Sequence, residues 1–462
     1  MRIREDESGQ MLVMTALSLV MLLGFVALAV DVGVMFRAQR NMQIAADAAA
    51  IAAALNYQYS ASPNITSAAD SAAAANGVTN SSYVTVNSPP VNGWHTGVGY
   101  IEVIVNTPNP TFFMNVFGIP SLNVAARSVA GIVPSPACIY VLNPSASGTL
   151  SLQGSYQVDA NQCGVDVASN SSSAICITGS SSSAYFDASY IHVSNGSQGT
   201  FGNCKGSIQG TTITTVSTQV TDPLSSMVPP GQSTNNNVPA APYPPSVCNS
   251  GNTIGASTVT PTMVAGMTPA TATAASGQTY QIECFSSPGV TLANGVNLGT
   301  ATTSPAGATA GSNMVFLFEN GVTIGGTVNI YGTLDNYQGT FSQGNNSLSV
   351  YAPASDAAPY NGIAVMQSYT NTTGTCSPSA SKITPCIQMQ FGSSGGTTNY
   401  GQLSGLIYAP GSAVYLQDGG GGLQATGIIS AELIIGPSGL VITSYNAANP
   451  STTPLSTVAL VE

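Results

Sequence analysis

Three aspartates, Asp159, Asp166 and Asp187, have the residue type and spacing for acid–base chemistry, because they fall on neighbouring candidate strands. Aligned carboxylates are the groups that hydrolyse glycosidic bonds. Lyases that act on acidic polysaccharides also need basic side chains to hold the substrate, and Lys205 and Lys382 are the only lysines. The chain has no nucleophile elbow with a suitable histidine, no P-loop and no dinucleotide fingerprint. We therefore interpret the aspartates as solvated surface residues, and predict no catalytic residue, no cofactor and no enzyme.

Eight cysteines form the second group of reactive residues, and all of them follow residue 137. Their even number predicts disulfides made in an oxidising compartment, although the spacing does not fix the connectivity. The pair that we predict is Cys376 with Cys386, which flank a loop rich in Pro and Ser. A zinc site is the alternative, but there is no C-x-x-C motif and the two histidines lie far apart. The candidate disulfide cysteines are Cys138, Cys163, Cys176, Cys204, Cys248, Cys284, Cys376 and Cys386.

The charge pattern excludes nucleic acid as a partner. The chain has seven basic and 18 acidic residues, for a formal net charge of -11. Four of the basic residues lie in the first 40 positions. A nucleic-acid-binding surface needs clustered Lys and Arg to displace counterions, and the bulk of the chain has no such cluster. With 43% apolar residues the chain can still bury a large core.

The N-terminal region contains an apolar run long enough to cross a membrane. Met11–Val30 comprises 20 residues without a charge, and a helix of about 20 such residues spans the hydrocarbon of a bilayer. We predict a transmembrane helix over residues 11–35, whose direction the flanking charges leave open. A cleaved signal peptide is the alternative, since Ala27-Leu28-Ala29 fits an A-x-A site, but the apolar run is longer than an ordinary signal.

An alanine-rich stretch follows, without Gly or Pro, and predicts that the helix continues over residues 36–58. Its small side chains favour either close approach by another helix or packing against the chain's own domain. Arg37 and Arg40 are predicted to lie at the interface and fix the depth of the helix. Asp31 is predicted near the membrane boundary, or as a partner for a positive group on an assembly protein.

The order of these features resembles the N-terminal region of TadG-like (TadE/TadG) proteins of the Flp (Tad) pilus assembly system. The resemblance rests on Gly9-Gln10, the apolar span, AVDVG at 29–33, Arg37, Arg40, and QIAADAAAIAAA at 43–54, which includes Asp47. It implies a bacterial inner-membrane protein with residues 1–10 in the cytoplasm, its bulk outside, and other pilus-assembly subunits as partners. Pilin-type subunits are cut after a Gly that precedes a Glu at a fixed offset, where this chain has Met14. Cleavage after Gly9 is therefore not expected.

A small module follows the helix. SYVTVN at 82–87 and YIEVIVN at 100–106 alternate apolar and polar residues around Pro and Gly, which predicts a hairpin. SLNVAARSVAGI at 121–132 is a third candidate strand. Together with the long helix, these strands predict a pilin-like αβ module over residues 59–134. The stretch 101–133 also resembles the membrane-proximal ending of the TadG-like family.

From residue 135 the sequence consists of short apolar strands separated by Gly, Ser, Asn and Thr. This pattern of short strands and turns favours a β-solenoid, so we predict a parallel β-helix over 135–220 and 263–462. A β-sandwich is the alternative. The Pro- and Asn-rich segment 221–262 is predicted as a linker or insertion. Short segments such as GLIYAP at 405–410 also resemble the repeats of TadG-like and related pilus-tip proteins. The predicted fold class is α+β and mostly β.

The sequence thus predicts a membrane-anchored, extracytoplasmic, non-catalytic component of Flp pilus assembly. Its role would be that of a pilus-tip or adhesive subunit. Long polar faces of a solenoid rich in Ser, Thr, Asn and Tyr would bind surface glycans or proteins through many weak contacts. Two alternatives stay open: a β-helical glycan-active enzyme, and a surface adhesin independent of pili.

Overall fold

The computed structural model divides the chain into two compact units. Unit 1 consists of Met1–Val133 and Val458–Glu462, and unit 2 is Pro134–Thr457, so that unit 2 is inserted in the sequence of unit 1. The residues that the structure describes are 8–59, 63–97, 99–134, 137–178, 184–198, 204, 208, 211–217, 219–225, 227, 248–255, 258–259, 270–273, 279–287, 289–303, 309–337, 339–354, 360–367, 387–392, 402–417, 423–437, 440–443 and 456–462.

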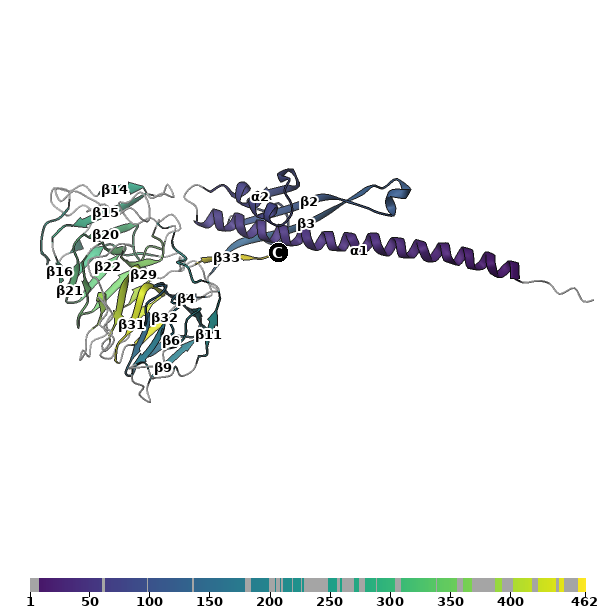
Figure 1. The fold of residues 1–462 in the computed structure, drawn as a ribbon. Helices are drawn as coiled ribbons and strands as arrows, with labels where there is room; N and C mark the ends of the chain where they lie inside the picture. The colour runs from purple at the N-terminus through teal and green to yellow at the C-terminus, as the bar shows by residue number, and fades with distance from the viewer. Residues whose placement is uncertain are drawn as a thin grey trace, which may run out of the picture. The chain divides into compact units, whose positions relative to one another are not determined.

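Helix α1 spans Ser8–Tyr59 and confirms the predicted long N-terminal helix (Figure 1). Leu, Met and Ala, which are strong helix formers, fill nearly half of its positions. A second helix, α2, spans Ile65–Ala75, where the sequence pattern predicts none. The side chain of Asn64 caps α2 by accepting a hydrogen bond from the amide of Ser67 at 3.1 Å.

The alanine stretch of α1 packs within unit 1. Ala45, Ala46, Ala49, Ala50, Ala53 and Ala54 are fully buried, and so are Ala69 and Ala73 of α2. These residues belong to one apolar cluster. Small side chains let the two helices approach closely. The alanines therefore pack against the chain's own domain, which is the second of the two expected uses.

A four-stranded sheet completes unit 1, in the order β1-β2-β3-β33. Its strands are β1 Val84–Asn87, β2 Tyr100–Pro110, β3 Ser121–Pro134 and β33 Ser456–Leu460, with short 3₁₀ turns at Ser81–Tyr83 (η1) and Met114–Phe117 (η2). β1 and β2 are antiparallel, as are β2 and β3. Residues 456–460 are expected in the solenoid from the sequence, but the structure places them in this sheet.

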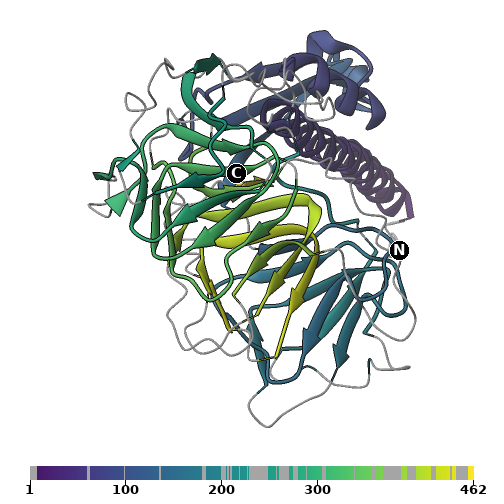
Figure 2. The ribbon, with the colours of Figure 1, turned by 90° about the vertical axis from the view of Figure 1, so that its left-hand side faces the viewer.

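Unit 2 is rich in strands, and most of the pairings in its sheets are parallel (Figure 2). The largest sheet contains β4 Ala137–Val141, β5 Leu150–Gln153, β7 Gly164–Val167, β8 Ile175–Thr178, β10 Ile191–Ser194, β11 Ile213–Val216, β12 Thr253–Ile254, β14 Ala270–Thr273, β15 Thr279–Phe285, β16 Val290–Ala293, β20 Met314–Phe318, β21 Val322–Gly325, β23 Thr333–Asn336, β24 Phe341–Ser342, β26 Ile363–Met366, β27 Ile387–Phe391, β29 Leu406–Leu416 and β31 Gly427–Ile435.

Two further parallel sheets and one short antiparallel pair accompany the largest sheet. One sheet contains β13 Thr258–Val259, β17 Val296–Gly299, β22 Val328–Tyr331, β25 Leu348–Tyr351 and β28 Leu403–Ser404. The other contains β6 Gln157–Ala160, β9 Tyr185–Ala188, β30 Leu423–Ala425 and β32 Leu440–Thr443. The antiparallel pair is β18 Thr302–Thr303 with β19 Thr309–Ala310.

The strands of unit 2 do not stack in chain order. β4 pairs with β7, and β7 with β10, toward one end of the large sheet. On its other side β4 pairs with β31, which leads through β29, β26, β23 and β20 to β15. The same order recurs where β31 pairs with β5 and β32 with β6. The chain therefore enters the stack in its middle, runs to one end, and returns from the other end.

Like side chains stack in register between neighbouring strands. The rings of Phe285 and Phe318 lie 4.8 Å apart in the core. The amide of Asn329 donates to Oδ1 of Asn297 at 2.9 Å, which forms a short asparagine ladder. In-register pairs of this kind stabilise parallel stacks because each side chain meets its equivalent one strand away.

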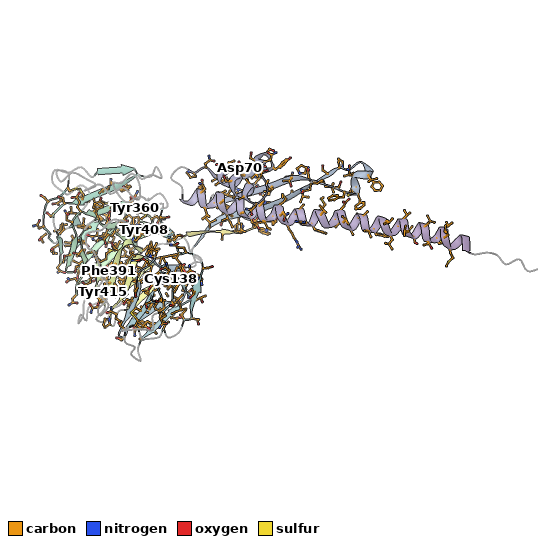
Figure 3. The ribbon with its side chains drawn as sticks, viewed as in Figure 1. Asp70, Cys138, Tyr360, Phe391, Tyr408 and Tyr415 are labelled. Atoms are coloured by element: carbon orange, nitrogen blue, oxygen red, sulfur yellow. A yellow bond between two sulfur atoms is a disulfide. The ribbon has the colours of Figure 1, made fainter. Side chains whose placement is uncertain are left out.

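The first described residues of the Pro- and Asn-rich segment pack on the large sheet. The hydroxyl of Tyr408 on β29 donates to Asp222 at 2.8 Å and to the carbonyl of Leu224 at 3.2 Å. Leu224 is itself buried in the main core. Figure 3 locates Tyr408 in unit 2. The segment therefore contributes to the core on the side that precedes residue 228.

Three disulfides confirm that the cysteines pair. They are Cys138–Cys163, Cys176–Cys204 and Cys248–Cys284. The predicted pair of Cys376 and Cys386 lies outside the described residues and stays a prediction. Cys138 is on β4 and Cys163 directly precedes β7, its neighbour in the sheet, so this bond ties adjacent strands together.

Removing the Cys248–Cys284 bond should destabilise unit 2. The bond closes a separation of 36 residues, and loop-closure entropy gives a loss of about 4 kcal/mol. Replacing both cysteines by Ser should therefore lower the midpoint of denaturant unfolding of unit 2. Unit 1 serves as the internal control, because its described residues contain no cysteine. An unchanged midpoint for unit 2 would contradict the prediction.

Glu283 should make unit 2 less stable as pH rises. The residue is 3% exposed, and its Oε1 has no hydrogen-bond partner among the described residues. Burial raises the pKa of Glu283 from its ordinary 4.5 to about 7. Because the folded pKa is the higher one, stability is greatest below pH 4.5 and is lost as pH rises through 7.

Between about pH 5 and pH 8 this group alone should cost about 2 to 3 kcal/mol of folding free energy. Glu283→Gln should flatten that part of the pH profile, measured by denaturant unfolding of the full chain. Asp187→Asn, a change at an exposed residue, is the matched control. A profile that keeps its slope in Glu283→Gln would show that other groups carry it.

Candidate anchoring and assembly site

The exposure of α1 changes at Asp31. Residues 11–30 are exposed with the one exception of Ala27, and Met11 and Phe25 are each 72% exposed. Among the described helices, α1 is the one long and apolar enough to cross a membrane. From Asp31 onward one side is covered, beginning with Asp31 and Ala38 and continuing into the buried alanines. The spacing of about one helical turn puts these residues on a single face.

The carboxylate of Asp31 holds the tip of the β2–β3 hairpin. Its Oδ1 accepts hydrogen bonds from the amides of Phe112 at 2.9 Å and Phe113 at 3.2 Å. Its Oδ2 accepts from Phe113 at 3.0 Å and Met114 at 2.7 Å. These amides open the 3₁₀ turn η2, whose first N–H groups have no partner within the turn. An anionic acceptor at such a terminus is favourable, so one buried carboxylate fixes where the hairpin meets α1.

The hairpin tip, which we define as Thr111–Ile119, exposes large apolar side chains. Phe117 is 85% exposed, Val116 81% and Phe112 62%. The tip and its strands carry no charge between Glu102 and Arg127. The hydroxyl of Thr111 donates to the carbonyl of Ile119 and closes the base of the tip. The tip is therefore an ordered apolar protrusion and not a polar loop.

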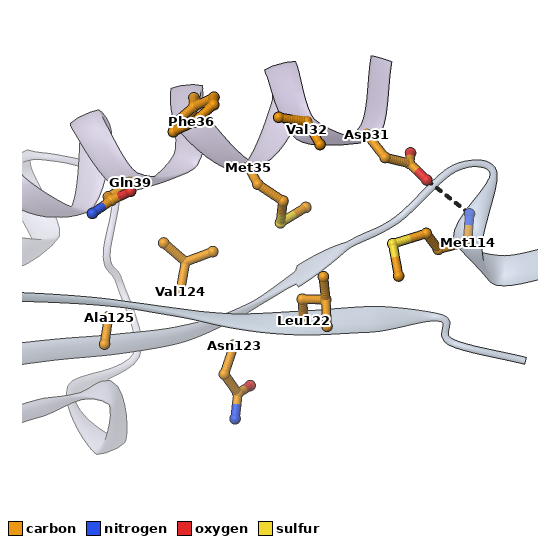
Figure 4. A pocket seen from close by; sticks show the side chains of 10 residues that line it. All are labelled: Asp31, Val32, Met35, Phe36, Gln39, Met114, Leu122, Asn123, Val124 and Ala125. Atoms are coloured by element: carbon orange, nitrogen blue, oxygen red, sulfur yellow. Dashed lines mark hydrogen bonds between the residues drawn. The ribbon is translucent and has the colours of Figure 1, made fainter. Parts of the chain in front are cut away.

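A cavity of about 380 Å³ lies between α1 and the hairpin, beside Asp31 (Figure 4). Val32, Met35 and Phe36 line it from α1, and Leu122 and Val124 line it from β3. Met114 of the tip stands at the end where its amide meets Asp31. The lining is mostly apolar, which suits a hydrocarbon side chain more than a polar ligand.

The other residues predicted for this site lie along α1. Gly9 and Gln10 are in its first turn. Arg37 and Arg40 are exposed, and their position at a membrane interface stays a prediction. The side-chain amide of Gln43 donates to Asp47 at 2.7 Å and to the backbone carbonyl of Arg127 at 3.1 Å. The second bond joins the helix to β3. A positive group on another protein as partner for Asp31 stays a prediction.

An ion cluster centred on Arg127 joins β33 to the rest of unit 1. Nε of Arg127 lies 2.5 Å from Oε1 of Glu102, and its Nη1 lies 2.7 Å from Oε2 of Glu462. Glu102 is fully buried, and its Oε2 also accepts a hydrogen bond from the side-chain amide of Asn87 at 2.7 Å. Hydrogen bonding to Arg127 lowers the pKa of Glu462 to about 2. Burial alone would raise the pKa of Glu102. The hydrogen bonds from Arg127 and Asn87 outweigh burial and hold this pKa below its usual value.

The three candidate aspartates do not converge. Asp159 on β6 and Asp187 on β9 are neighbours in register, whereas Asp166 on β7 lies in the large sheet. Asp166 pairs with His192, with 3.5 Å between Oδ1 and Nδ1. Burial raises the pKa of Asp166 to about 6, and His192 opposes the rise. Within the described residues, no group of three metal-ligating side chains occurs.

Two parts of the site are not predicted from the sequence. Arg127 and Glu462 lie 335 positions apart, so no local pattern links them. The hairpin tip has a signal in the sequence: TFFMNVFGI at 111–119 groups six large apolar residues in a turn between two strands. Such a turn is ordinarily polar, so an apolar turn indicates a surface that something covers.

The comparisons with known proteins agree with the N-terminal features. Residues 9–56 match the family described as "Putative Flp pilus-assembly TadE/G-like". The matched segment lies within α1 and includes Asp31 and the alanine stretch. It confirms the resemblance stated from the sequence. No curated protein and no solved structure matches the chain.

Proposed function

We propose that this chain, which carries a TadE/G-like Flp pilus-assembly domain over residues 9–56, is a membrane-anchored, non-catalytic structural component of Flp pilus assembly. The observation that carries the proposal is the coincidence of that domain with α1, whose first part is apolar and exposed on every side. The anchor lies in the inner membrane, and units 1 and 2 lie outside the cytoplasm.

The length of the exposed run supports the anchor. Met11–Val30 has 20 residues, and at about 1.5 Å per residue it extends about 30 Å, the thickness of the hydrocarbon core. Large apolar side chains that face water on all sides of a helix are unfavourable, whereas hydrocarbon around them is not. The covered stripe begins at Asp31, directly after this run.

Unit 2 is the displayed body, and we propose that it is a parallel β-helix. The parallel pairings, the in-register side-chain stacks and the three sheets with matching strand order support this fold over a β-sandwich. The body extends a long face with few charges, which suits contact with surface glycans or proteins at a pilus tip. Disulfide bonds suit a protein that works outside the cytoplasm.

Counting surface pili on cells that lack this chain tests the proposal. We expect few or no pili, and restoration by the full chain. A variant in which a cleavable signal peptide replaces residues 8–30 should be exported without restoring pili, because its anchor is gone. The paired change Asp159→Asn with Asp187→Asn should restore pili fully. Pili at normal number without the chain would contradict the proposal.

A further inference from the structure

We propose that the hairpin tip, Thr111–Ile119, is a second membrane element that inserts into the outer interface of the bilayer beside α1. The inference rests on the proposed anchoring of α1. It concerns a different part of unit 1, in which strands and not the helix present the apolar residues. The ligand would be the lipid itself, at the level where acyl chains meet the headgroups.

The contact with Asp31 sets the height of the tip. Asp31 directly follows the 20-residue apolar run, so an anchor that spans the hydrocarbon places it at the boundary. The amides of Phe112, Phe113 and Met114 lie within 3.2 Å of its carboxylate oxygens. The tip is therefore held at the membrane surface and not at a distance from it.

The side chains of the tip suit this depth. Phe112, Val116 and Phe117 are all more than 60% exposed, and no described part of the chain covers them. The nearest charges along the strands are Glu102 and Arg127, which lie away from the turn in the Arg127 cluster. Interfacial elements bury Phe and aliphatic side chains at this boundary.

The backbone of the tip is also prepared for a medium that contains little water. Asp31 satisfies the amides of Phe112, Phe113 and Met114. Further backbone bonds lie within the tip and at its base: the amide of Thr111 donates to the carbonyl of Pro120, Val116 to Phe113, Gly118 to Asn115 and Ile119 to Met114. A loop in water can leave such amides to the solvent, whereas a segment that enters an apolar phase needs partners for them within the protein.

The covering surface is more consistent with lipid than with a protein. The hydrogen bonds to Asp31 place the exposed apolar tip beside the end of the exposed apolar run of α1, which the same proposal places in lipid. One medium then covers both surfaces. A protein partner would need to fit the tip and at the same time avoid the bilayer at the same level.

Tryptophan quenching in vesicles tests the inference. The full chain would be reconstituted in phosphatidylcholine vesicles after Trp94→Phe, which removes the only tryptophan. Phe117→Trp then reports on the tip, and the substitution is mild because the side chain is exposed. Leu22→Trp in a separate protein reports on the middle of the anchor. Unmodified Trp94, 93% exposed, reports on the water-facing side of unit 1.

We expect phosphatidylcholine brominated near the headgroup end of its acyl chains to quench Phe117→Trp, with a blue-shifted emission. Bromine near the bilayer centre should quench Leu22→Trp more strongly, and neither lipid should quench Trp94. Quenching of Leu22→Trp without that of Phe117→Trp would overturn the inference and leave the anchor in place. Shielding of Phe117→Trp from both brominated lipid and aqueous iodide would mean that protein covers the tip, and would also overturn it. Loss of lipid quenching at both positions would overturn the proposed anchor together with the inference.

Discussion

Arg127→Gln is expected to destabilise unit 1 by about 3 kcal/mol, the lower end of the cost of removing one partner from a buried ion pair, because Glu102 is buried but Arg127 is partly exposed. The change leaves Glu102 buried without its cation, and it releases Glu462 at the same time. Glu462 lies two residues after the end of β33. The amides of β33 and of its neighbour β3 should therefore be the first to lose protection from hydrogen exchange. The amide of Val461, which donates to Val129 at 2.9 Å, is a sensitive reporter.

Hydrogen exchange of the full chain in detergent, read by mass spectrometry of peptides from β3 and β33, measures this loss. Arg40→Gln is the matched control, since Arg40 is exposed on α1. The ion cluster also has a pH signature. Its carboxylates have lowered pKa values, so its stabilisation is complete above their ordinary value of 4.5 and is lost as pH falls toward 2. Equal protection in Arg127→Gln and Arg40→Gln would show that the cluster does not hold β33.

Asp31→Ala is the second change with a large expected effect, a loss of order localised in the hairpin tip. Three amides lose an anionic acceptor, and hydrogen bonds to charged groups contribute about 1.5 to 3 kcal/mol each. Asp31→Asn should be less damaging, because the oxygen of the Asn side chain can still accept hydrogen bonds from these amides. The rest of unit 1 has its own core of alanines and strands and should stay folded.

Exchange of the amides of residues 111–119 measures this prediction. Asp47→Ala is the control, because Asp47 accepts a hydrogen bond from Gln43 on its own helix and, among the described residues, from no amide of the hairpin tip. A tip that remains protected in Asp31→Ala would mean that the carboxylate does not position it. The proposed membrane contact of the tip would then lose the feature that sets its height.

The sequence predicts those parts of the fold that arise from local chemistry. A charge-free run of membrane length and an alanine run without Gly or Pro are sufficient for α1. Alternation at period two is sufficient for β1 and β2. Helix α2 lacks a comparable signal, because ITSAADSAAAA is short and its apolar residues are all small except Ile65.

The long-range arrangement has no local signal. Nothing in the strands β4 and β31 indicates that they are neighbours, because irregular spacing hides the repeat and the chain enters the stack in its middle. Asp31 is a related case. A carboxylate after an apolar run indicates a boundary, but the sequence gives no sign that the partner is a set of backbone amides some 80 positions away.

Mass spectrometry of the N-terminal region is the most direct test of the membrane anchor. The sample would be the protein from alkali-washed membranes and, separately, from sheared surface filaments. The predicted result is an intact apolar run, with peptides from residues before Met11 recovered in the membrane fraction. A terminus at Val30 would show cleavage after Ala27-Leu28-Ala29, and would contradict both the anchor and the function built on it.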